Sequence, residues 1–566
     1  MNLMQEFRKD VVGILSRKVP RKLVEEGLEK PPENIGSDLA YPCFALSKRK
    51  KRNPAQLARE ISSAIRPSGM VGEINFYGPY INFFIDWKKA APALLRSVLR
   101  EKDDYGRGKR TRKRVMVEYS APNTNKPLHL GHLRNGAIGM SVASILGFAG
   151  HDVVRANLFS NRGSHICKSM LAYRKWGRGT KPAVKPDHFV GRFYVMFEKR
   201  KTKKLEKEVN EMLRKWESGD REVMELWRKM DSWATEGFRK TYERFGSEFD
   251  AEFRESDFWD KAGPVIERGL KKRVFRKEKD GAVVADLEKE GLGKKAILRS
   301  DDTSIYITND LALTVHKFRR FRLDESVWVV GSEQNTYFRQ LFMIFRQLGY
   351  PWAERCRHLS YGLVFLPEGK MKSREGKVVD ADDIMDDMQK LAAREIKKRE
   401  KRISRKELDE RALQIGLAAL KYFFLRVDSL KDIHFNPAES LSFEGDTGPY
   451  MQYSHARACS ILRKAGKGLS GKRAAPCFDN LKEIALLKQI ADFPDAVQRA
   501  AKDMKPHYIA GYCLDLSARF NDFYHSVAVL KASGVYRQGR LDLVRAIGQT
   551  LNNALKLLGI EAPEKM

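Results

Sequence analysis

The sequence predicts an α/β protein in which a doubly wound parallel sheet follows an α+β domain and precedes an all-α helical bundle. Three observations predict this order. An apolar run at residues 115–117 passes through a polar turn into a helical pattern that ends at Gly150, which is how a parallel-sheet unit begins. Segments of strand and helix periodicity then alternate to about residue 380, and amphipathic helical patterns fill the remainder. The central part is therefore expected to have a Rossmann-like fold.

The segments on either side of the sheet are predicted from periodicity and capping. Residues 54–65 have a helical pattern, whereas residues 71–74 and 80–85 have the composition of strands, and together they indicate a small α+β domain. Near the start of the bundle, Ser404 and Glu407 have the spacing of a capping box. The bundle helices are expected at residues 405–426, 481–502, 508–531 and 540–558.

The chain of 566 residues carries a formal net charge of +33. Such an excess of lysine and arginine is typical of a protein with a polyanionic partner, because it sets the affinity for phosphates and the salt dependence of that affinity. A generally basic set of proteins in the source organism is the alternative, and one sequence does not distinguish the two. The length allows about three to four domains with large buried cores.

The cysteines and the N-terminal residues indicate the cellular compartment in which the protein is expected. The six cysteines include no C-x-x-C pair, so neither a zinc ribbon nor a disulfide framework is indicated, and a reducing, cytoplasmic location is expected. Glu6 and Asp10 interrupt the apolar residues of the N-terminus, which argues against a signal or transit peptide. The uncharged residues 135–150 are too few and too rich in glycine to cross a bilayer, so no membrane association is expected.

The polar turn at residues 126–132 has the features of a phosphate site. A helix N-terminus offers unpaired N–H groups and a partial positive charge, and Gly131 lets a ligand approach the backbone. His129 and His132 stand beside it as donors, so the turn predicts a nucleoside triphosphate site. The alternative is a pair of structural or metal-binding histidines, and the metal reading is weaker because no cysteine or carboxylate follows at a zinc-ligand spacing.

A second group of polar residues follows two further predicted strands. Residues 304–308 are predicted to form a strand, followed by Asp310 and a helix, and residues 326–330 form another strand that ends near Gln334. Because the carboxyl ends of parallel strands face one crevice, Asp310 and Gln334 are expected to meet there. The alternative for Asp310 is a helix cap, which its spacing alone favours.

A glycine-flanked basic loop at residues 366–379 is the third group. Lys370 and Lys372 in this loop have the character of groups that close over phosphates and stabilise charge in a transition state. Most such loops are only solvated, and that alternative stays open from the composition alone.

The run SAPNTNKPLHLGHLRNGAIG resembles the HIGH signature of class I aminoacyl-tRNA synthetases, and its S-x-P-N and K-P flanks are similar to arginyl-tRNA synthetases. The basic loop resembles the KMSKS loop of that class, but Lys372 and Ser373 stand where the common pattern has serine and then lysine. Arginyl enzymes often lack that second lysine and have one before the HIGH motif, which here is Lys126. Either Lys126 or Lys372 is expected to supply the missing charge.

The resemblance, which extends over nearly the whole chain, implies ligation of L-arginine to tRNA(Arg) through an arginyl-adenylate. ATP is then a substrate that brings Mg²⁺, no zinc is expected, and the enzyme is expected to be a monomer. The resemblance implies catalytic roles for His129, His132, Lys126, Lys370 and Lys372; ATP contacts from Leu130, Gly131, Met371 and Ser373; and arginine contacts from Glu118, Asn123, Tyr306, Asp310 and Gln334. A guanidinium is a planar fork of donors, so a carboxylate such as Asp310 is its natural acceptor.

The resemblance also implies three domains with separate contacts to tRNA. They are an N-terminal tRNA-contacting domain at residues 1–108, a catalytic domain at 109–385 with a helical insertion around 173–233, and an anticodon-binding domain at 386–566. The implied tRNA contacts are Tyr80, Asn82, Tyr450, Tyr453, Tyr524 and Met566. Aromatic residues three apart on a bundle helix are otherwise more often part of the core.

Two other functions compete with this interpretation. A class I ligase for glutamate, cysteine or lysine would keep the HIGH motif but not the predicted cation pocket. A non-catalytic tRNA-binding paralogue is the second, and the intact HLGH sequence argues against it.

Overall fold

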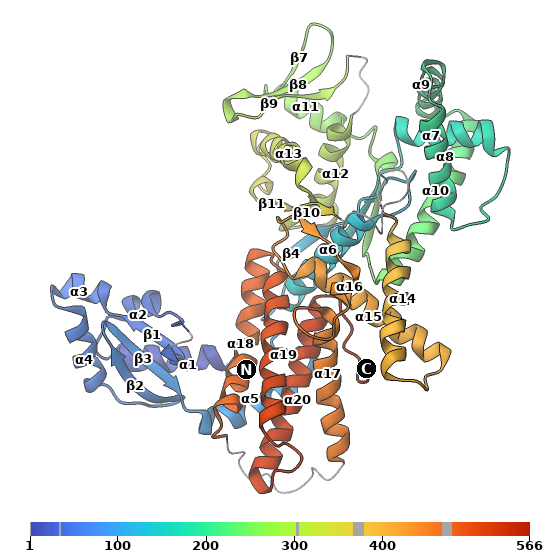
Figure 1. Cartoon of the computed structure of the whole chain (residues 1–566). Helices are drawn as coiled ribbons and strands as arrows, with labels where there is room; N and C mark the ends of the chain where they lie inside the picture. Colours follow the sequence, from blue (N-terminus) through green and yellow to red (C-terminus); the bar gives the residue numbers. More distant parts are fainter. Residues whose placement is uncertain (1, 33–34, 301–304, 366–378, 467–477) are drawn as a thin grey trace.

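The computed structural model describes residues 2–32, 35–300, 305–365, 379–466 and 478–566. At its centre lies a five-stranded parallel sheet with the spatial order β11-β10-β4-β5-β6 (Figure 1). The predicted doubly wound parallel sheet is therefore confirmed. The strands are β4 (Arg114–Glu118), β5 (Asp152–Phe159), β6 (Ala251–Arg254), β10 (Glu325–Gly331) and β11 (Cys356–Tyr361).

The order of the strands places the ligand crevice. The chain runs outward from β4 through β5 and β6, and it then returns to form β10 on the opposite side of β4. The direction of winding therefore reverses between β4 and β10. In open α/β sheets, ligands bind outside the carboxyl ends of the strands at such a reversal. The HIGH turn, residues 126–132, follows β4 at this edge.

Helix α6 (Leu130–Phe148) lies between the sheet and the helical bundle (Figure 1). Because it packs on both, its residues are buried almost all the way round and it shows no polar stripe. At Gly139 the helix approaches Tyr119, which follows β4, so closely that a Cβ there would lie 2.3 Å from the Tyr119 ring. The middle of α6 is thus fixed directly against the residue that follows the central strand.

The strand predicted at residues 304–308 is wrong where the structure describes it, because α12 (Tyr306–Phe321) already begins at Tyr306. The Ile305 N–H donates to Thr308 Oγ1 at 2.9 Å, which caps the helix. The run of β-branched residues favours a strand on propensity alone, but burial of the helix face and this cap decide otherwise. With α13 (Asn335–Gln347), α12 covers the face of the sheet opposite α6 (Figure 1).

Two insertions project from the carboxyl edge of the sheet (Figure 1). The first is helical, as predicted, and consists of α7 (Ser164–Ala172), α8 (Pro186–Arg200), α9 (Lys203–Glu217) and α10 (Arg221–Phe245). The second was not predicted: it contains α11 (Gly263–Lys271) and an antiparallel sheet of β7 (Phe275–Lys277), β8 (Val283–Leu287) and β9 (Gly293–Leu298). The sequence between β6 and α12 therefore departs from simple strand and helix alternation.

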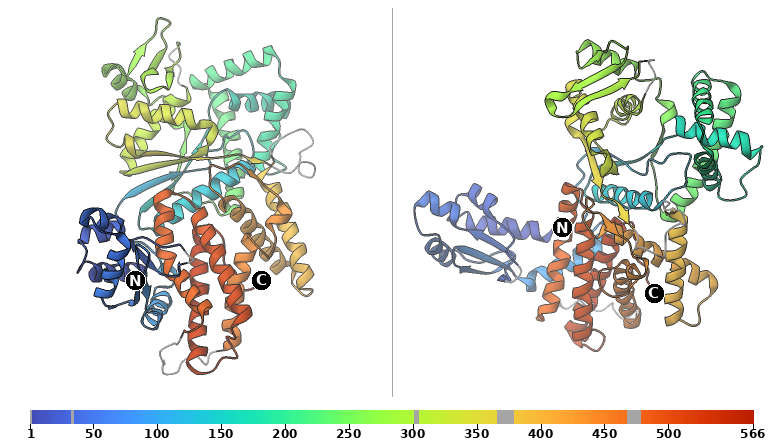
Figure 2. Two further views of the ribbon diagram at one scale, coloured as in Figure 1. Left: turned by 60° about the vertical axis from the view of Figure 1, so that its left-hand side comes forward. Right: turned by 45° about the horizontal axis from the view of Figure 1, so that its top comes forward.

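The N-terminal part is an α+β domain, as predicted. Its antiparallel sheet has the order β1-β3-β2, and it stands beside the bundle in both views of Figure 2. Its elements are α1 (Leu3–Leu15), α2 (Arg21–Gly27), β1 (Leu39–Pro42), α3 (Phe44–Lys50), α4 (Pro54–Ala64), β2 (Val71–Tyr77), β3 (Tyr80–Ile85) and α5 (Trp87–Glu101). Asn53 caps α4 by accepting from the backbone of Ala55 and Gln56.

The C-terminal part is a helical bundle, which confirms the third element of the predicted fold. Ser404 caps α15 by accepting from the Glu407 N–H at 3.2 Å, as the capping spacing predicts. The helices are α14 (Ala381–Arg399), α15 (Arg405–Leu425), α16 (Pro437–Ser440), α17 (Gly448–Ala465), α18 (Leu481–Asp503), α19 (His507–Ser526) and α20 (Gly534–Leu557). Two short parallel strands, β12 (Val364–Phe365) and β13 (Ile433–His434), join the sheet domain to the bundle.

A fully buried arginine on α6 holds this junction together. The Arg134 guanidinium donates to the carbonyls of Gly362 and Leu363, just before β12, and to those of Ser429 and Lys431, before β13. The four distances lie between 2.6 and 3.0 Å. Burial lowers the pKa of Arg134 to about 10, so the side chain stays charged at neutral pH. One cation on α6 therefore binds two other segments that are far apart in sequence.

Replacing this arginine tests the junction. Arg134→Met should lower the free energy of unfolding by at least about 3 kcal/mol, because each buried carbonyl left unpaired costs about 1–3 kcal/mol. The midpoint of thermal unfolding, followed by circular dichroism, measures the change. Arg405→Met is the matched control, since the Arg405 side chain is 96% exposed and forms a surface ion pair with Asp409 at 3.9 Å. Equal midpoints for the two variants would contradict the role of Arg134.

Candidate functional site

The two histidines of the HIGH turn are fixed by the backbone of that turn. His129 Nδ1 accepts from the Gly131 N–H at 3.1 Å, and His132 Nδ1 accepts from the His129 N–H at 3.2 Å. Since both Nδ1 atoms are acceptors, each neutral ring carries its proton on Nε2. The ring centroids lie 3.9 Å apart. The turn therefore presents two Nε2–H donors next to the N-terminus of α6.

Both imidazoles are neutral at physiological pH. Burial and the nearby Lys126 lower the pKa of His129 to about 4. Burial, with the neighbouring His129 and Lys126, holds the pKa of His132 well below its usual value. The turn can thus donate hydrogen bonds to a phosphate without carrying imidazolium charge.

The backbone between β4 and the HIGH turn is held in a rare conformation. Ser120 and Ala121 have φ values of 75° and 47°, in the left-handed region that disfavours residues with a Cβ. Two side-chain amides compensate: Asn135 accepts from the Ser120 N–H at 2.6 Å, and Asn157 accepts from the Ala121 N–H at 3.0 Å. The Asn135 amide also donates to the Val329 carbonyl of β10 at 2.7 Å. Asn135 therefore joins α6 to the ends of both crevice strands.

Asp310 lies in the crevice as a largely desolvated carboxyl group. It is the fifth residue of α12 and Ile305 is the N-cap, so the alternative that Asp310 caps the helix is wrong. The Tyr337 hydroxyl of α13 donates to Asp310 Oδ2. Burial raises the pKa of Asp310 to about 6, although the Tyr337 hydrogen bond and the nearby Lys317 oppose this shift. The crevice thus holds a carboxyl group whose pKa lies above its usual range.

Glu118, the last residue of β4, is paired with a lysine rather than open to solvent. Both Glu118 and Lys317 are buried, and Lys317 Nζ donates to Glu118 Oε2. Lys317 lies two helical turns beyond Asp310 on α12, and its charge also acts on Asp310. The ion pair links the central strand to the helix that carries Asp310.

A second carboxyl group near Asp310, Glu255, was missed from the sequence. It directly follows β6, and its Oε1 accepts from the Asn309 amide at 2.9 Å. Its Oε2 is buried and has no hydrogen-bond partner among the described residues. Burial raises the pKa of Glu255 to about 7, and the charge of Asp310 adds to the shift. The signal available in the sequence was an acidic residue at the carboxyl end of a strand.

The other predicted arginine contacts lie nearer the solvent. Tyr306 is 57% exposed, and its hydroxyl lies 3.4 Å from Nδ1 of His165. Gln334 ends the short helical turn after β10, and Asn123 bridges to Ser160 beyond β5; both are exposed. The side chains at the carboxyl edge thus include buried acids and exposed polar groups.

Lys126 is exposed at the start of the HIGH turn, and its Nζ lies 4.6 Å from the centroid of the Tyr194 ring on α8. The other predicted loop contacts, Lys370, Met371, Lys372 and Ser373, lie outside the described residues. The described chain resumes at Val379, and here it pairs with the HIGH turn through an antiparallel bridge between His129 and Asp380.

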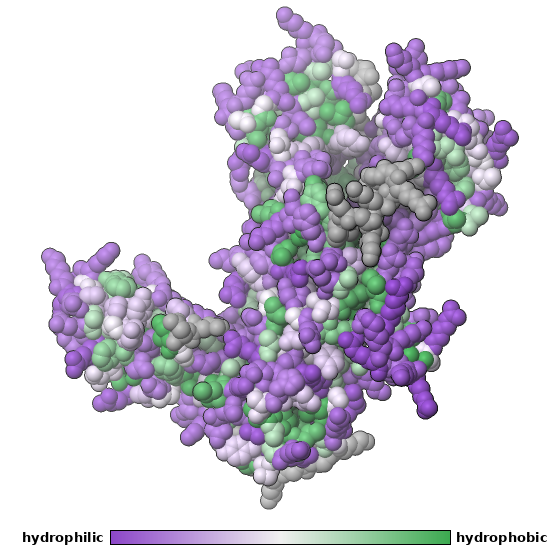
Figure 3. Space-filling model, in the orientation of Figure 1, coloured by the Kyte–Doolittle hydropathy of each residue, from purple (hydrophilic) through white to green (hydrophobic). Residues whose placement is uncertain are grey.

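An aromatic surface lies on the N-terminal domain. Tyr80 packs edge-on against Phe44, with 5.9 Å between the ring centroids. Phe44, Phe76 and Tyr77 are exposed, Tyr77 to 75%. Asn82, in contrast, is buried, and its amide oxygen accepts from the Ser37 hydroxyl at 3.3 Å. The surface therefore offers aromatic rings but not the Asn82 amide, and Figure 3 shows apolar residues among hydrophilic ones on this domain.

A cavity of about 930 Å³ opens between α14, α17 and α19 of the bundle. Tyr450 and Tyr453 both line it, so these residues of α17 face open space rather than only the core. The Arg457 guanidinium lies 4.7 Å from the ring centroids of both Tyr453 and Tyr524. Met566, at the C-terminus, is half-buried against the bundle core. The cavity thus combines aromatic faces with cations.

Three family models match successive parts of the chain. They are the arginyl tRNA synthetase N-terminal domain over residues 3–85, the catalytic domain of class I (R) tRNA synthetases over residues 94–437, and the DALR anticodon binding domain over residues 451–566. The catalytic-domain model alone covers more than half of the chain.

The chain belongs to the arginyl-tRNA synthetase family. Two curated relatives named Arginine–tRNA ligase, from Treponema pallidum and Treponema denticola, are each 42% identical to it and are covered over 100% and 99% of both chains. The solved structure of Thermus thermophilus arginyl-tRNA synthetase has a TM-score of 0.83 at 29% identity and covers 99% of this chain and 100% of that one. The Plasmodium falciparum enzyme, at 19% identity, shows the same fold with a TM-score of 0.82 over 99% of both chains.

The resemblance of this synthetase to the arginyl family, inferred from its motifs, is thereby confirmed. The assigned site residues and the boundaries at 108 and 385 remain predictions. Among the described residues, no helix is both long and apolar enough to span a bilayer.

The raised pKa values of Asp310 and Glu255 predict that the affinity for arginine depends on pH. A guanidinium keeps its charge at all relevant pH values, whereas Asp310 and Glu255 gain protons as the pH falls through about 6 and about 7. Arginine affinity should therefore weaken by roughly tenfold or more between pH 8 and pH 5.5. Equilibrium dialysis with labelled arginine measures it. An affinity that stays constant over this range would show that neither acid faces the arginine.

Proposed function

We infer that this synthetase catalyses the ATP-dependent ligation of L-arginine to its cognate tRNA through an arginyl-adenylate. One observation about the site carries this inference. The desolvated acids Asp310 and Glu255 lie at the carboxyl edge of the sheet, and the HIGH turn places its two neutral imidazole donors at the same edge. An acidic pocket for a cationic side chain thus shares one crevice with a donor-lined site for phosphates.

We propose that Asp310 and Glu255 together accept the guanidinium. A guanidinium presents five N–H donors in a planar fork, and one carboxylate accepts only two of them in parallel. The buried Oε2 of Glu255 supplies a further acceptor, and Tyr337 holds Asp310 in place. Tyr306 and Gln334 would cover the pocket from its open side. The ammonium of lysine offers no such fork, so it would leave these acceptors poorly paired.

The α-amino group of the arginine is proposed to meet Glu118 and Asn123. Glu118 is oriented by its ion pair with Lys317. A carboxylate that already has one cationic partner binds another less strongly, so we expect Glu118 to orient the substrate more than to provide affinity.

We propose that the triphosphate of ATP lies over the N-terminus of α6. The Nε2–H groups of His129 and His132 would donate to phosphate oxygens, and Leu130 and Gly131 allow close approach of the backbone. Lys126 lies beside the turn, and Lys370, Met371, Lys372 and Ser373 would approach from the loop. Mg²⁺ would enter with ATP and would neutralise phosphate charge.

The proposed reaction requires positioning and charge stabilisation rather than a side-chain nucleophile. The arginine carboxylate attacks the α-phosphorus, the bond to the β-phosphate oxygen breaks, and pyrophosphate leaves. The terminal ribose hydroxyl of the tRNA then attacks the carbonyl carbon and releases AMP. The neutral imidazoles act as hydrogen-bond donors to the phosphates throughout.

Two surfaces are proposed to hold the tRNA. The aromatic surface with Tyr80 would stack on an unpaired base of the tRNA corner, supported by Phe44, Phe76 and Tyr77, whereas Asn82 would have to become exposed to contribute. The bundle cavity would receive anticodon-loop bases on its aromatic faces, with Tyr450, Tyr453, Tyr524 and Met566 as contacts. We propose that the enzyme acts as a cytoplasmic monomer, with domains at residues 1–108, 109–385 and 386–566.

One experiment separates this proposal from its competitors. Pyrophosphate exchange should depend on arginine, and the proposal further expects that it needs tRNA. Exchange with lysine, glutamate or cysteine in place of arginine would indicate another class I ligase. If no amino acid supports exchange while tRNA still binds, the chain is a non-catalytic tRNA-binding paralogue.

Asp310→Asn tests the arginine pocket. The variant keeps the shape but loses the charge, and a hydrogen bond to a charged group contributes about 1.5–3 kcal/mol. The KM for arginine should therefore rise roughly 10- to 100-fold, while tRNA affinity and the melting temperature stay near those of the unchanged enzyme. Glu333→Gln, which neutralises an exposed acid on the same edge of the sheet, is the control. Normal charging of Asp310→Asn at low arginine would exclude Asp310 as a ligand.

A comparison of two lysines tests the source of the missing loop charge. If Lys126 replaces the second lysine of the KMSKS pattern, Lys126→Ala should reduce the rate of arginine-dependent pyrophosphate exchange more than Lys372→Ala does. Removal of one charge from a transition state costs about 3 kcal/mol, so a loss on the order of 100-fold is expected for the functional lysine. The reverse order would assign the charge to Lys372.

A further inference from the structure

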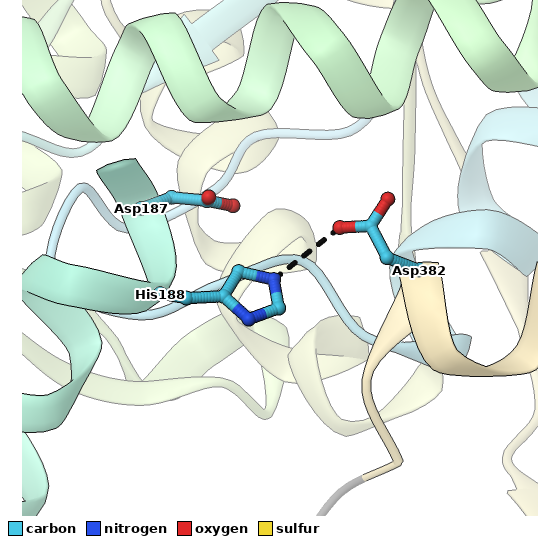
Figure 4. Close-up of side chains that lie close together, drawn as sticks. All are labelled: Asp187, His188 and Asp382. Atoms are coloured by element: carbon cyan, nitrogen blue, oxygen red, sulfur yellow. Dashed lines mark hydrogen bonds and ion pairs between the residues drawn. The ribbon is translucent and has the colours of Figure 1, made fainter. Parts of the chain in front are cut away.

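A cluster of charged side chains joins α8 to α14 next to the HIGH turn. His188 Nε2 lies 3.3 Å from Asp382 and 3.4 Å from Asp380. Lys185 Nζ, just before α8, lies 2.6 Å from Asp382 and 3.1 Å from Asp187, and it also donates to Thr241 of α10. Figure 4 shows Asp187 and His188 on one helix pointing toward Asp382 on the other. We name Lys185, Asp187, His188, Asp380 and Asp382 the α8–α14 latch.

A metal ion is the first alternative for this cluster. Asp187, His188 and Asp382 place one ligand atom each within 4.8 Å of one another. However, the Lys185 ammonium already lies between two of these carboxylates, and its three N–H donors match its three partners, Asp187, Thr241 and Asp382. A divalent cation would have to displace this ammonium. The geometry therefore favours an internal ionic joint over a metal site.

The segment that the latch holds pairs directly with the HIGH turn. The Leu130 N–H donates to the Val379 carbonyl at 2.9 Å, and the Ala381 N–H donates to the Leu128 carbonyl at 3.0 Å. These two bonds enclose the bridge between His129 and Asp380. The residue that carries one latch carboxylate is thus the backbone partner of the first HIGH histidine.

Helix α8 contacts the opposite side of the same turn. Gly191 lies against Pro127 so closely that a Cβ would approach the Pro127 ring to 2.7 Å, and the Tyr194 ring lies against Lys126. The turn is therefore enclosed between α8 on one side and residues 379–381 on the other. The latch is the direct joint between α8 and α14 that closes this ring of contacts, and α10 adds to it through Arg244, which pairs with Asp386 of α14 at 2.6 Å.

We propose that His188, with Lys185, is a positioning residue that fixes the HIGH turn for adenylate formation by locking α8 to α14. It touches no substrate in this scheme and acts through Asp380 and the backbone of residues 128–130. The proposal rests on the proposed role of the turn in binding ATP. A displacement of about 1 Å in such a turn reduces the rate of the chemical step roughly 100-fold.

The charges that face His188 define its pH dependence. They are Asp380 and Asp382 from α14, Asp187 from α8 itself and Lys185 before it, and the Lys185 ammonium also donates to the Thr241 hydroxyl of α10. The hydrogen bond to Asp382 raises the pKa of His188, Asp380 and Asp187 add to this, and burial and Lys185 oppose it. The His188 side of the latch is consequently strongest below this raised pKa, as long as its carboxylates stay ionised, and weakens as the pH rises through it.

The test compares His188→Ala and His188→Gln in the full-length enzyme. His188→Ala should lower kcat of arginine-dependent pyrophosphate exchange roughly 10- to 100-fold, with little change in the KM for arginine or in tRNA affinity. His188→Gln can still donate to Asp382, so it should restore part of the rate and should lose the decline that the unchanged enzyme shows at alkaline pH. His507→Ala, which removes a bundle histidine 4.0 Å from Asp428, is the matched control.

Hydrogen exchange supplies a readout that does not depend on activity. Backbone amides of residues 128–132 should exchange faster in His188→Ala than in His507→Ala. Unchanged amide exchange together with an unchanged kcat in His188→Ala would overturn the proposal, as would equal losses in kcat and tRNA affinity. If the unsubstituted enzyme does not catalyse pyrophosphate exchange, the proposed function fails, yet faster amide hydrogen exchange in His188→Ala would still support the latch.

Mn²⁺ tests the metal alternative. If Mn²⁺ raises the melting temperature of the unsubstituted enzyme but not that of Asp187→Asn, the cluster is a metal site and not a latch.

Discussion

A single buried guanidinium fixes the position of α6, the helix that starts at the HIGH turn, relative to the rest of the molecule. Arg134 makes four hydrogen bonds to carbonyls from two segments, and both segments lead into the strands that join the sheet domain to the bundle. A buried cation without these partners would be very costly, so the junction is either intact or lost. Because α6 packs on both the sheet and the bundle, the HIGH turn at its start takes its position from both domains.

The crevice separates two kinds of electrostatic environment within one fold. On the side of α12, burial raises the pKa of Asp310 and Glu255, so the pocket favours a ligand that brings positive charge. On the side of α6, burial lowers the pKa of His129 and His132, so the turn stays uncharged. The same desolvation therefore produces an acidic pocket and a neutral donor site, and the type of side chain decides which.

Periodicity and motif spacing predicted the architecture but not the partners of the site residues. The strand at residues 115–117, the helix that ends at Gly150 and the bundle helices α15, α18, α19 and α20 were predicted because local pattern and tertiary burial agree there. The strand at 304–308 was wrong because a cap by Thr308 and burial of Ile307 override β-propensity. Glu255, Tyr337 and Lys317 were missed because they meet Asp310 and Glu118 only through the packing of separate elements. No spacing in the sequence encodes those contacts.

The neutral state of the two HIGH-turn imidazoles has a consequence for turnover. A polyphosphate held by uncharged donors gains less Coulomb energy than one held by imidazolium ions, and this difference applies equally to the departing pyrophosphate. In the proposed ATP site, the turn would thus orient the phosphates without retaining the product tightly. The hydrogen bonds from its neutral rings would also respond little to ionic strength, whereas association of a polyanionic RNA with a chain of net charge +33 depends on it strongly. Salt would therefore act on the encounter with RNA more than on the hydrogen bonds that the turn donates.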